Sequence, residues 1–203
     1  MFRLFLCLFF ITQAFAKNNP FVPPLESVAV KDVTELTTAN IGDHIQKEES
    51  PNVKTVNSTI PSLEAKIQNW YIMSTTIKHR NVCYMVKYPE EQIGNHKETR
   101  KPYLMITFIN NRRYEISIST GYKYRNNSVL NLSIDGTIFK LAANNNIAWS
   151  QGVFDDFAML NIMMTSFRAM ASAESSVGTY SVDTYDLIGF KDAYQKMLSV
   201  CKK

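Results

Sequence analysis

Short runs of β-branched and aromatic residues recur along the chain from Trp70 onward, with turn-forming residues between them. Two of these runs, 114–120 and 129–134, place an apolar residue at every second position. Such alternation is typical of a strand with one face on a core and the other in water. Strands of this length and spacing predict a domain built mainly of β-sheet. The six runs are 70–77, 82–88, 103–109, 114–120, 129–134 and 137–141.

The turns between the runs favour antiparallel neighbours. Asp135-Gly136 joins two of the runs and is a strong two-residue hairpin signal, because both turn positions need positive φ. Asn110-Asn111 is expected to turn the preceding hairpin, and the apolar segment 103–108 is expected to lie centrally in the sheet. We therefore predict a mostly β protein, an antiparallel β-sandwich or partly open barrel, with helices packed on the sheet.

Two segments near the carboxyl end have helical spacing. The segment 157–170 is apolar on nearly all sides, which predicts a largely buried helix. Asp155 and Asp156 precede it, where their negative charge suits the positive end of the helix dipole. A strand over about 176–187 and an amphipathic helix over 190–201 are expected to follow.

The amino-terminal part divides into a leader and a spacer. Residues 1–16 combine Arg3, an apolar run over 4–11 and the sequence Ala14-Phe15-Ala16, which is typical of a cleaved secretory signal peptide. The apolar run is too short for a transmembrane span. Residues 17–63 mix prolines with polar residues and are expected to form a flexible spacer before a domain over 64–203. The mature protein is expected in the periplasm, at the cell surface or secreted.

Cleavage after Ala16 would leave two cysteines, Cys83 and Cys201. Cys201 continues the apolar stripe of the last expected helix, and Cys83 lies in an early strand. An even cysteine count in an exported protein favours a disulfide bond between them. The alternative is two separate buried thiols.

Charge and histidine placement argue against several classes of function. The formal net charge of +4 is spread along the chain rather than clustered, which disfavours nucleic-acid binding. His44, His79 and His96 lack the spacing of metal ligands, and no phosphate-binding loop or nucleophile elbow occurs. We therefore expect no metal and no cofactor.

The acidic residues Asp183 and Asp186 are the nearest approach to a catalytic pair. On a strand, an offset of three places them on opposite faces, so they do not suit paired acid–base chemistry. We expect no catalytic residues and a protein that is not an enzyme; an enzyme of unrecognised type is the alternative.

An aromatic and basic turn is the best candidate for a binding site. Exposed aromatic and cationic side chains on sheet-end loops can bind sugars, peptides or anionic surfaces. Tyr124 and Arg125 are expected to be exposed, whereas the rings of Tyr122 and Trp149 have packing on the core as their alternative. The candidate residues are Tyr122, Lys123, Tyr124, Arg125 and Trp149.

Several segments share their order and spacing with a known family. They are Arg100-Lys101-Pro102-Tyr103, Glu115-Ile116-Ser117 leading to Gly121-Tyr122, Ile134-Asp135-Gly136, Ala148-Trp149, and Gly178-Thr179 through Asp183 to Phe190. Together they resemble the invasion-associated locus B family of exported alphaproteobacterial proteins, over roughly residues 68–201. Members often have an arginine before the Gly-Thr pair, where this chain has Val177.

The resemblance implies a largely β domain in the periplasm or envelope, linked in some bacteria to virulence through entry into host cells. It implies no catalytic residues. From the residues and the resemblance together, we expect an exported protein that binds an envelope or host-surface protein or glycan. A periplasmic structural or chaperone-like envelope factor is the alternative.

Overall fold

The computed structural model describes residues 60–77, 80–95, 97–110 and 113–202. The expected leader and most of the spacer lie outside these residues, as do His44, His79 and His96. No helix in the described part of the chain has both the length and the apolar character needed to span a bilayer.

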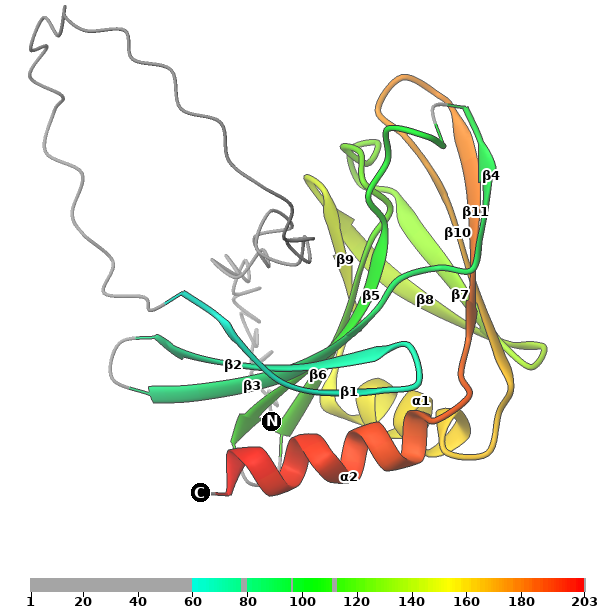
Figure 1. Cartoon of the computed structure of the whole chain (residues 1–203). Helices are drawn as coiled ribbons and strands as arrows, with labels where there is room; N and C mark the ends of the chain where they lie inside the picture. Colours follow the sequence, from blue (N-terminus) through cyan, green and yellow to red (C-terminus); the bar gives the residue numbers. More distant parts are fainter. Residues whose placement is uncertain (1–59, 78–79, 96, 111–112, 203) are drawn as a thin grey trace, which may run out of the picture. The chain divides into compact units, whose positions relative to one another are not determined.

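The strands form one antiparallel sheet of eleven strands, in the order β1-β2-β3-β5-β6-β9-β8-β7-β10-β11-β4 (Figure 1). The sheet has two free edges, at β1 and β4, so it does not close, which confirms the predicted mostly β fold with helices on the sheet. The strands are β1 (Ser62–Ile67), β2 (Trp70–Ile77), β3 (Arg80–Lys87), β4 (Glu91–Gly94), β5 (Tyr103–Asn110), β6 (Arg113–Ser119), β7 (Val129–Ile134), β8 (Thr137–Asn144), β9 (Ile147–Trp149), β10 (Arg168–Glu174) and β11 (Tyr180–Asp186).

Strand β4 departs from the simple up-and-down order. It lies between β3 and β5 in the sequence, yet it pairs with β11 at the far edge of the sheet. The chain therefore leaves β3, crosses to the opposite edge and returns to β5. This crossing brings the segment before β5 next to β11, where the buried ion pair described below forms.

The predicted hairpin and the central strand are both confirmed. β7 and β8 pair antiparallel around Asp135 and Gly136, whose φ angles of 44° and 91° are positive as the turn requires. In β5, successive residues Leu104, Met105 and Ile106 are all fully buried. The sequence pattern does not indicate the strands β1, β4, β9 and β10.

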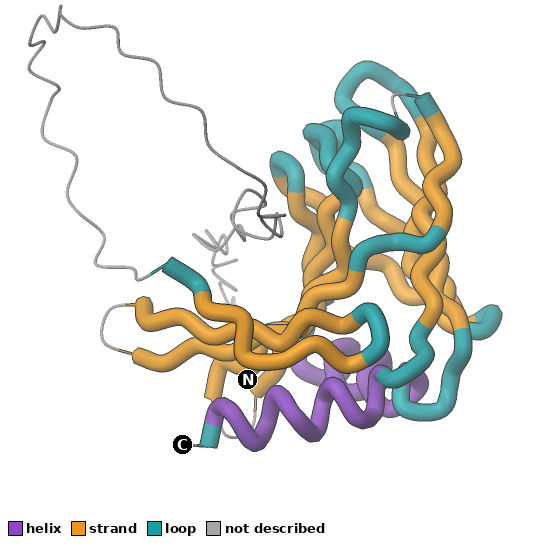
Figure 2. The backbone as a smooth tube through the Cα atoms, viewed as in Figure 1, coloured by secondary structure: helices purple, strands orange, loops and turns teal. Residues whose placement is uncertain are grey.

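Two helices pack on the sheet, as Figure 2 shows. α2 (Phe190–Cys201) has the predicted bounds and lies against β1, β2 and β3, where Phe190 packs edge-on against Trp70 with ring centroids 5.2 Å apart. α1 (Val153–Met163) lies against β6 and β7.

The predicted extent of the first helix is wrong. α1 covers 153–163 rather than 157–170, and residues 168–174 form β10. In β10, Ala169, Ala171 and Ala173 are buried while the residues between them are not, which is the two-residue period of a strand. The expected strand over 176–187 begins later, at Tyr180, because residues 175–179 form the turn between β10 and β11.

The burial of α1 also differs from expectation. Met159 and Met163 are buried, but Phe154 and Phe157 are 91% and 63% exposed, so one face of the helix is open to solvent. Asp155 and Asp156 lie in the first turn of α1, as the sequence predicts, and Asp156 also forms bonds outside the helix. Its buried carboxylate accepts a hydrogen bond from the Ile116 amide at 2.9 Å and another from the Ser150 hydroxyl, which ties α1 to β6.

Candidate functional site

The loop after β6 holds four of the five candidate binding residues. Tyr122 is half-buried, and its hydroxyl donates a hydrogen bond to the Ala173 carbonyl at 3.0 Å and lies 2.8 Å from the Ser181 hydroxyl. The guanidinium of Arg100 lies over its ring, 5.7 Å from the centroid. The Tyr122 side chain therefore holds the loop on β10 and β11, which is the packed alternative considered for it.

The expectation that Tyr124 is exposed is wrong, because its side chain is 1% exposed. Its hydroxyl donates to the Ile118 carbonyl at 3.1 Å, and its ring meets that of Tyr122 edge-on. A β-bridge between Tyr124 and Ser175 places this loop next to the end of β10, where the Tyr124 ring is buried. Burial raises the pKa of Tyr124 far above its usual value.

The other three candidates differ in exposure. Lys123 and Arg125 are exposed, and Arg125 pairs with Glu174 at 3.1 Å. Trp149 is half-buried in β9, opposite Ser117 of β6. The structure thus places Tyr122 and Tyr124 in contact but leaves only Lys123 and Arg125 of the five open to solvent.

A buried ion pair lies beneath this loop, and sequence reasoning did not single it out. The Arg100 guanidinium donates two hydrogen bonds to Asp183, from Nη1 to Oδ2 at 3.0 Å and from Nη2 to Oδ1 at 2.8 Å. Nη1 also donates to the Thr120 carbonyl at 2.9 Å. The pair joins the segment before β5 to β11. Its only signal in the sequence is that both residues belong to the segments resembling the invasion-associated family.

Burial raises the pKa of Asp183, and the hydrogen bond and charge of Arg100 offset only part of this effect. The side chains of Arg100 and Asp183 are 4% and 0% exposed. Asp186 lies on the opposite face of β11 and is one-third exposed, which agrees with the expectation that the two carboxylates do not face each other.

A second ion-pair group links the ends of β3 and β11. Nζ of Lys87, whose side chain is fully buried, lies 2.7 Å from Oε1 of Glu90 and 3.1 Å from Oδ2 of Asp186. Burial acts to raise the pKa of Asp186, whereas its interactions with Glu90, Lys87 and the Ile188 amide lower it more, so the pKa lies below its usual value. The buried side chains of Arg100 and Lys87 thus each form an ion pair with an aspartate of β11.

The structure joins Cys83 of β3 to Cys201 of α2 by a disulfide bond, as the sequence predicts, with Cα atoms 5.8 Å apart. The two cysteines are separated by 118 positions. The bond fixes the carboxyl-terminal helix to an early strand of the domain.

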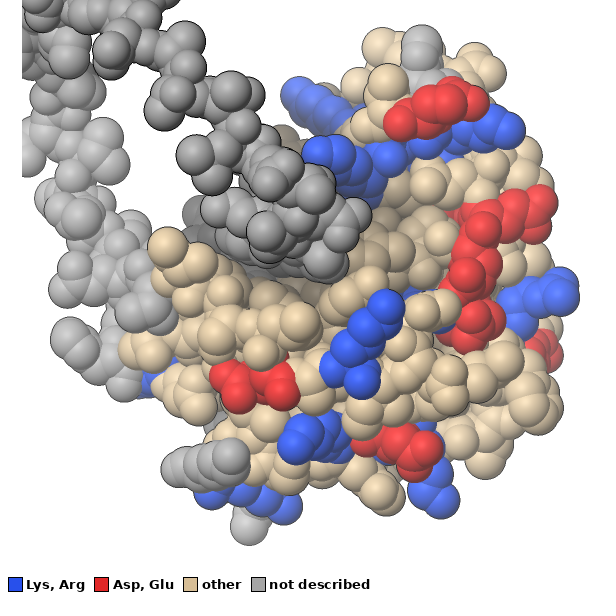
Figure 3. All heavy atoms as spheres, viewed as in Figure 1, with Lys and Arg blue, Asp and Glu red and all other residues tan. Residues whose placement is uncertain are grey.

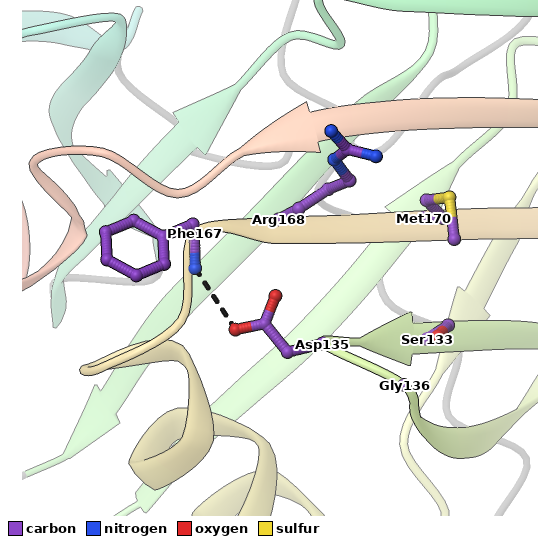
Figure 4. A pocket seen from close by; sticks show the side chains of 6 residues that line it. All are labelled: Ser133, Asp135, Gly136, Phe167, Arg168 and Met170. Carbon is purple, nitrogen blue, oxygen red and sulfur yellow. Dashed lines mark hydrogen bonds between the residues drawn. The ribbon is translucent and has the colours of Figure 1, made fainter.

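A shallow pocket of about 370 Å³ lies where the end of β7, the turn that follows it and the start of β10 meet. Figure 4 shows Arg168 and Met170 projecting from β10, with Asp135 at the end of β7 and Phe167 just before β10. The Phe167 amide donates a hydrogen bond to Oδ2 of Asp135 at 3.2 Å. The sequence pattern predicts Asp135 only as a turn residue, and it predicts Phe167 in a buried helix; Phe167 is instead 76% exposed.

Charged side chains of both signs lie on the face drawn in Figure 3. Several lysine and arginine side chains gather at the upper end of this view, aspartate and glutamate side chains form a row to the right, and both signs are mixed over the lower part. Within the described ranges, no group of three or more His, Cys, Asp or Glu side chains could hold a metal ion.

The sequence matches no protein-family model and no curated protein. Among solved structures, the chain is similar to invasion associated protein B from Bartonella henselae, with a TM-score of 0.53 and 14% sequence identity. The two chains share a fold. The match covers 70% of this chain and 100% of the Bartonella chain. At this identity the likeness concerns the fold alone, and it supports the family resemblance only at that level.

Proposed function

We propose that this chain is an exported protein of the bacterial cell envelope that acts by binding a partner and not by catalysis. The observation that carries the proposal is the likeness in fold to invasion associated protein B, which extends over the whole of that chain. The name of that protein connects it with invasion, and we infer a contribution to host-cell invasion for this chain as well. The partner is an envelope or host-surface protein or glycan.

The disulfide bond supports export. Disulfides persist in the periplasm and outside the cell, whereas cytosolic thiols are kept reduced. Cys83 and Cys201 meet in the folded domain. Together with the expected leader over 1–16, this pairing favours the periplasm or the cell surface as the site of action.

The ionisable groups inside the domain support binding over catalysis. Asp183 is held by both nitrogens of the Arg100 fork, and Lys87 is held between Glu90 and Asp186. Ionisable groups that are buried and paired in this way are poorly placed to exchange protons with a substrate. Lys123 and Arg125 remain the exposed members of the candidate binding loop.

Export is tested by locating the native protein and its amino terminus. Cells of the source bacterium are separated into cytosolic, periplasmic, membrane and culture fractions, and the protein is identified by mass spectrometry. We expect a chain that begins after Ala16, with Cys83 and Cys201 resistant to alkylation unless a reductant is added. Recovery in the cytosol with the leader attached would overturn the proposal.

The binding role is tested separately with the purified mature protein and cultured host cells. The double variant Lys123→Ala/Arg125→Ala should reduce cell binding, whereas Val177→Ala, a control in an exposed turn, should not. Unchanged binding by a correctly folded double variant would remove this loop from the site. Absence of cell binding by the unaltered protein would argue against the host-surface partner.

A periplasmic chaperone-like or structural role is the second candidate. Three phenylalanine side chains, Phe154, Phe157 and Phe167, are 91%, 63% and 76% exposed, and exposed apolar surface is a feature of proteins that bind other chains. Protection of the protein from protease added to intact cells, with suppression of aggregation of a reduced test protein, would favour this role over the first.

A further inference from the structure

The pocket between β7 and β10 combines an apolar surface with two groups that form directional contacts. We propose that it binds the carboxyl terminus of a partner chain whose last residue has a bulky apolar side chain. This inference goes beyond the proposed function, because it assigns a site and a ligand chemistry that do not depend on where the protein acts.

The apolar part of the pocket is formed by side chains held in place yet open to solvent. Phe167 is 76% exposed, although its backbone is fixed on both sides: its amide donates to Asp135, and its carbonyl accepts from Leu187 at 2.9 Å. Met170, which also lines the pocket, is 39% exposed. Ile138, 64% exposed, continues this surface, because Ser133 pairs with Met170 on one side and with Ile138 on the other. Rigidly presented aromatic side chains of this kind carry much of the binding energy at protein interfaces.

Arg168 supplies the group that would bind the terminal carboxylate. Its side chain is exposed at the start of β10 and makes no hydrogen bond or ion pair within the part of the chain that the structure describes. A guanidinium presents its donors as a planar fork that matches a carboxylate. Figure 4 shows this guanidinium on the opposite side of the pocket from Asp135.

Asp135 supplies the complementary acceptor. Its Oδ2 already accepts from the Phe167 amide, whereas its Oδ1 has no hydrogen-bond donor among the described residues. The backbone amide of a terminal residue could donate to Oδ1 while its carboxylate lies on the Arg168 side, away from the aspartate charge. A Cβ placed on Gly136 would meet no atom within 4 Å, so a peptide backbone could approach this turn closely.

The size of the pocket favours a chain terminus over an internal segment. A volume of about 370 Å³ is near the lower end for ligand sites and suits one or two residues. The apolar side chain, the carboxylate and the amide donor must therefore belong to a single residue. Only a terminal residue carries all three.

The test uses three small probes and the mature, disulfide-bonded protein labelled with ¹⁵N. N-acetylphenylalanine carries all three groups, N-acetylphenylalaninamide lacks the carboxylate, and N-acetylglycine lacks the side chain. We expect N-acetylphenylalanine to shift the amide signals of Gly136, Phe167, Arg168 and Met170 with a Kd on the order of millimolar, as its size allows. Both other probes should bind at least about tenfold more weakly, since each lacks one of the three contacts.

Two variants of exposed residues assign the contacts. Arg168→Gln should abolish the preference for the acid over the amide, and Phe167→Ala should weaken both. Arg80→Gln and Val177→Ala, at exposed positions outside the pocket, are the matched controls and should change neither.

The inference is overturned if N-acetylphenylalanine shifts none of these four signals at a concentration of tens of millimolar, or if the amide binds as well as the acid. It is also overturned if Arg168→Gln keeps the preference for the acid. A protein found in the cytosol could still pass this test, and an exported one could fail it, so this result and that of the proposed function are independent.

Discussion

Arg100 and Asp183 lie 83 positions apart in the sequence, and their side chains form a two-point ion pair inside the domain. The pair is possible because β4 joins β11 at the far edge of the sheet, which carries the segment before β5 across to β11. The Arg100 guanidinium also lies over the Tyr122 ring. The Arg100 side chain thus connects three parts of the domain: the segment before β5, strand β11 and the candidate binding loop.

Arg100→Met should destabilise the domain strongly, because it leaves the Asp183 carboxylate buried without its partner. Breaking a buried ion pair in this way costs about 3–5 kcal/mol. The double variant Arg100→Met/Asp183→Asn should recover part of that loss, since no buried charge is then left unpaired. Urea denaturation of the variants measures the free energies of unfolding.

Arg125→Met is the matched control, because the Arg125–Glu174 pair is exposed. Surface pairs contribute about 0–1 kcal/mol, so this variant should stay within that range of the unaltered protein. If Arg100→Met also stayed within that range, the buried pair would not be holding the crossing segment.

Gly121→Ala should destabilise the loop that carries the binding candidates more than Gly136→Ala destabilises its hairpin. Both glycines have positive φ, at 77° and 91°, so both variants carry the strain of about 1–3 kcal/mol expected for a sparsely populated backbone conformation. At Gly121 the new Cβ would also lie 2.6 Å from the Lys101 backbone nitrogen, whereas at Gly136 nothing lies within 4 Å. Thermal denaturation gives the two losses, and equal losses would contradict the close contact at Gly121.

Local sequence pattern predicted the elements whose structure depends on near neighbours. Alternating apolar residues predict β6 and β7, and Asp135-Gly136 predicts the hairpin between β7 and β8. Apolar residues at helical spacing predict the bounds of α2. The pairing of Cys83 with Cys201 follows from the cysteine count and the expected compartment, together with the place of Cys201 on the apolar stripe of the last helix. These predictions needed no knowledge of which distant strands meet.

The rest depended on long-range packing. The predicted helix over 157–170 runs into the first three residues of β10, because three alanines alternating with other residues give a weak strand signal after an apolar helix. The sequence predicts an exposed Tyr124, because nothing in the local sequence shows that this loop bridges to Ser175. Arg100 and Asp183 could not be joined without the β4–β11 pairing. The pocket around Phe167 was missed for the same reason.

Asp186 should make the stability of the domain fall in acid. Its folded pKa lies below the usual value, so the stability it contributes is complete above the unfolded pKa of about 3.9 and is lost as pH falls through the folded value. Asp186→Asn should therefore reduce stability at neutral pH and flatten the decline below about pH 4. Glu174→Gln, in an exposed pair, is the control. The measurement is the free energy of unfolding as a function of pH. Parallel curves for the unaltered protein and for Asp186→Asn would show that Asp186 has no such role.

Removal of the disulfide should lower stability without changing the fold. In the chain-entropy account, a bond that closes a loop of 118 positions stabilises the folded state by about 5 kcal/mol, because it restricts the unfolded chain. Cys83→Ala/Cys201→Ala should lose most of this, and dithiothreitol should lower the urea midpoint of the unaltered protein but not that of the variant. The reduced unaltered protein serves as the control, since it keeps both side chains but not the bond. An unaltered protein whose midpoint does not respond to the reductant, and which gives two alkylated thiols without it, would show that the bond does not form.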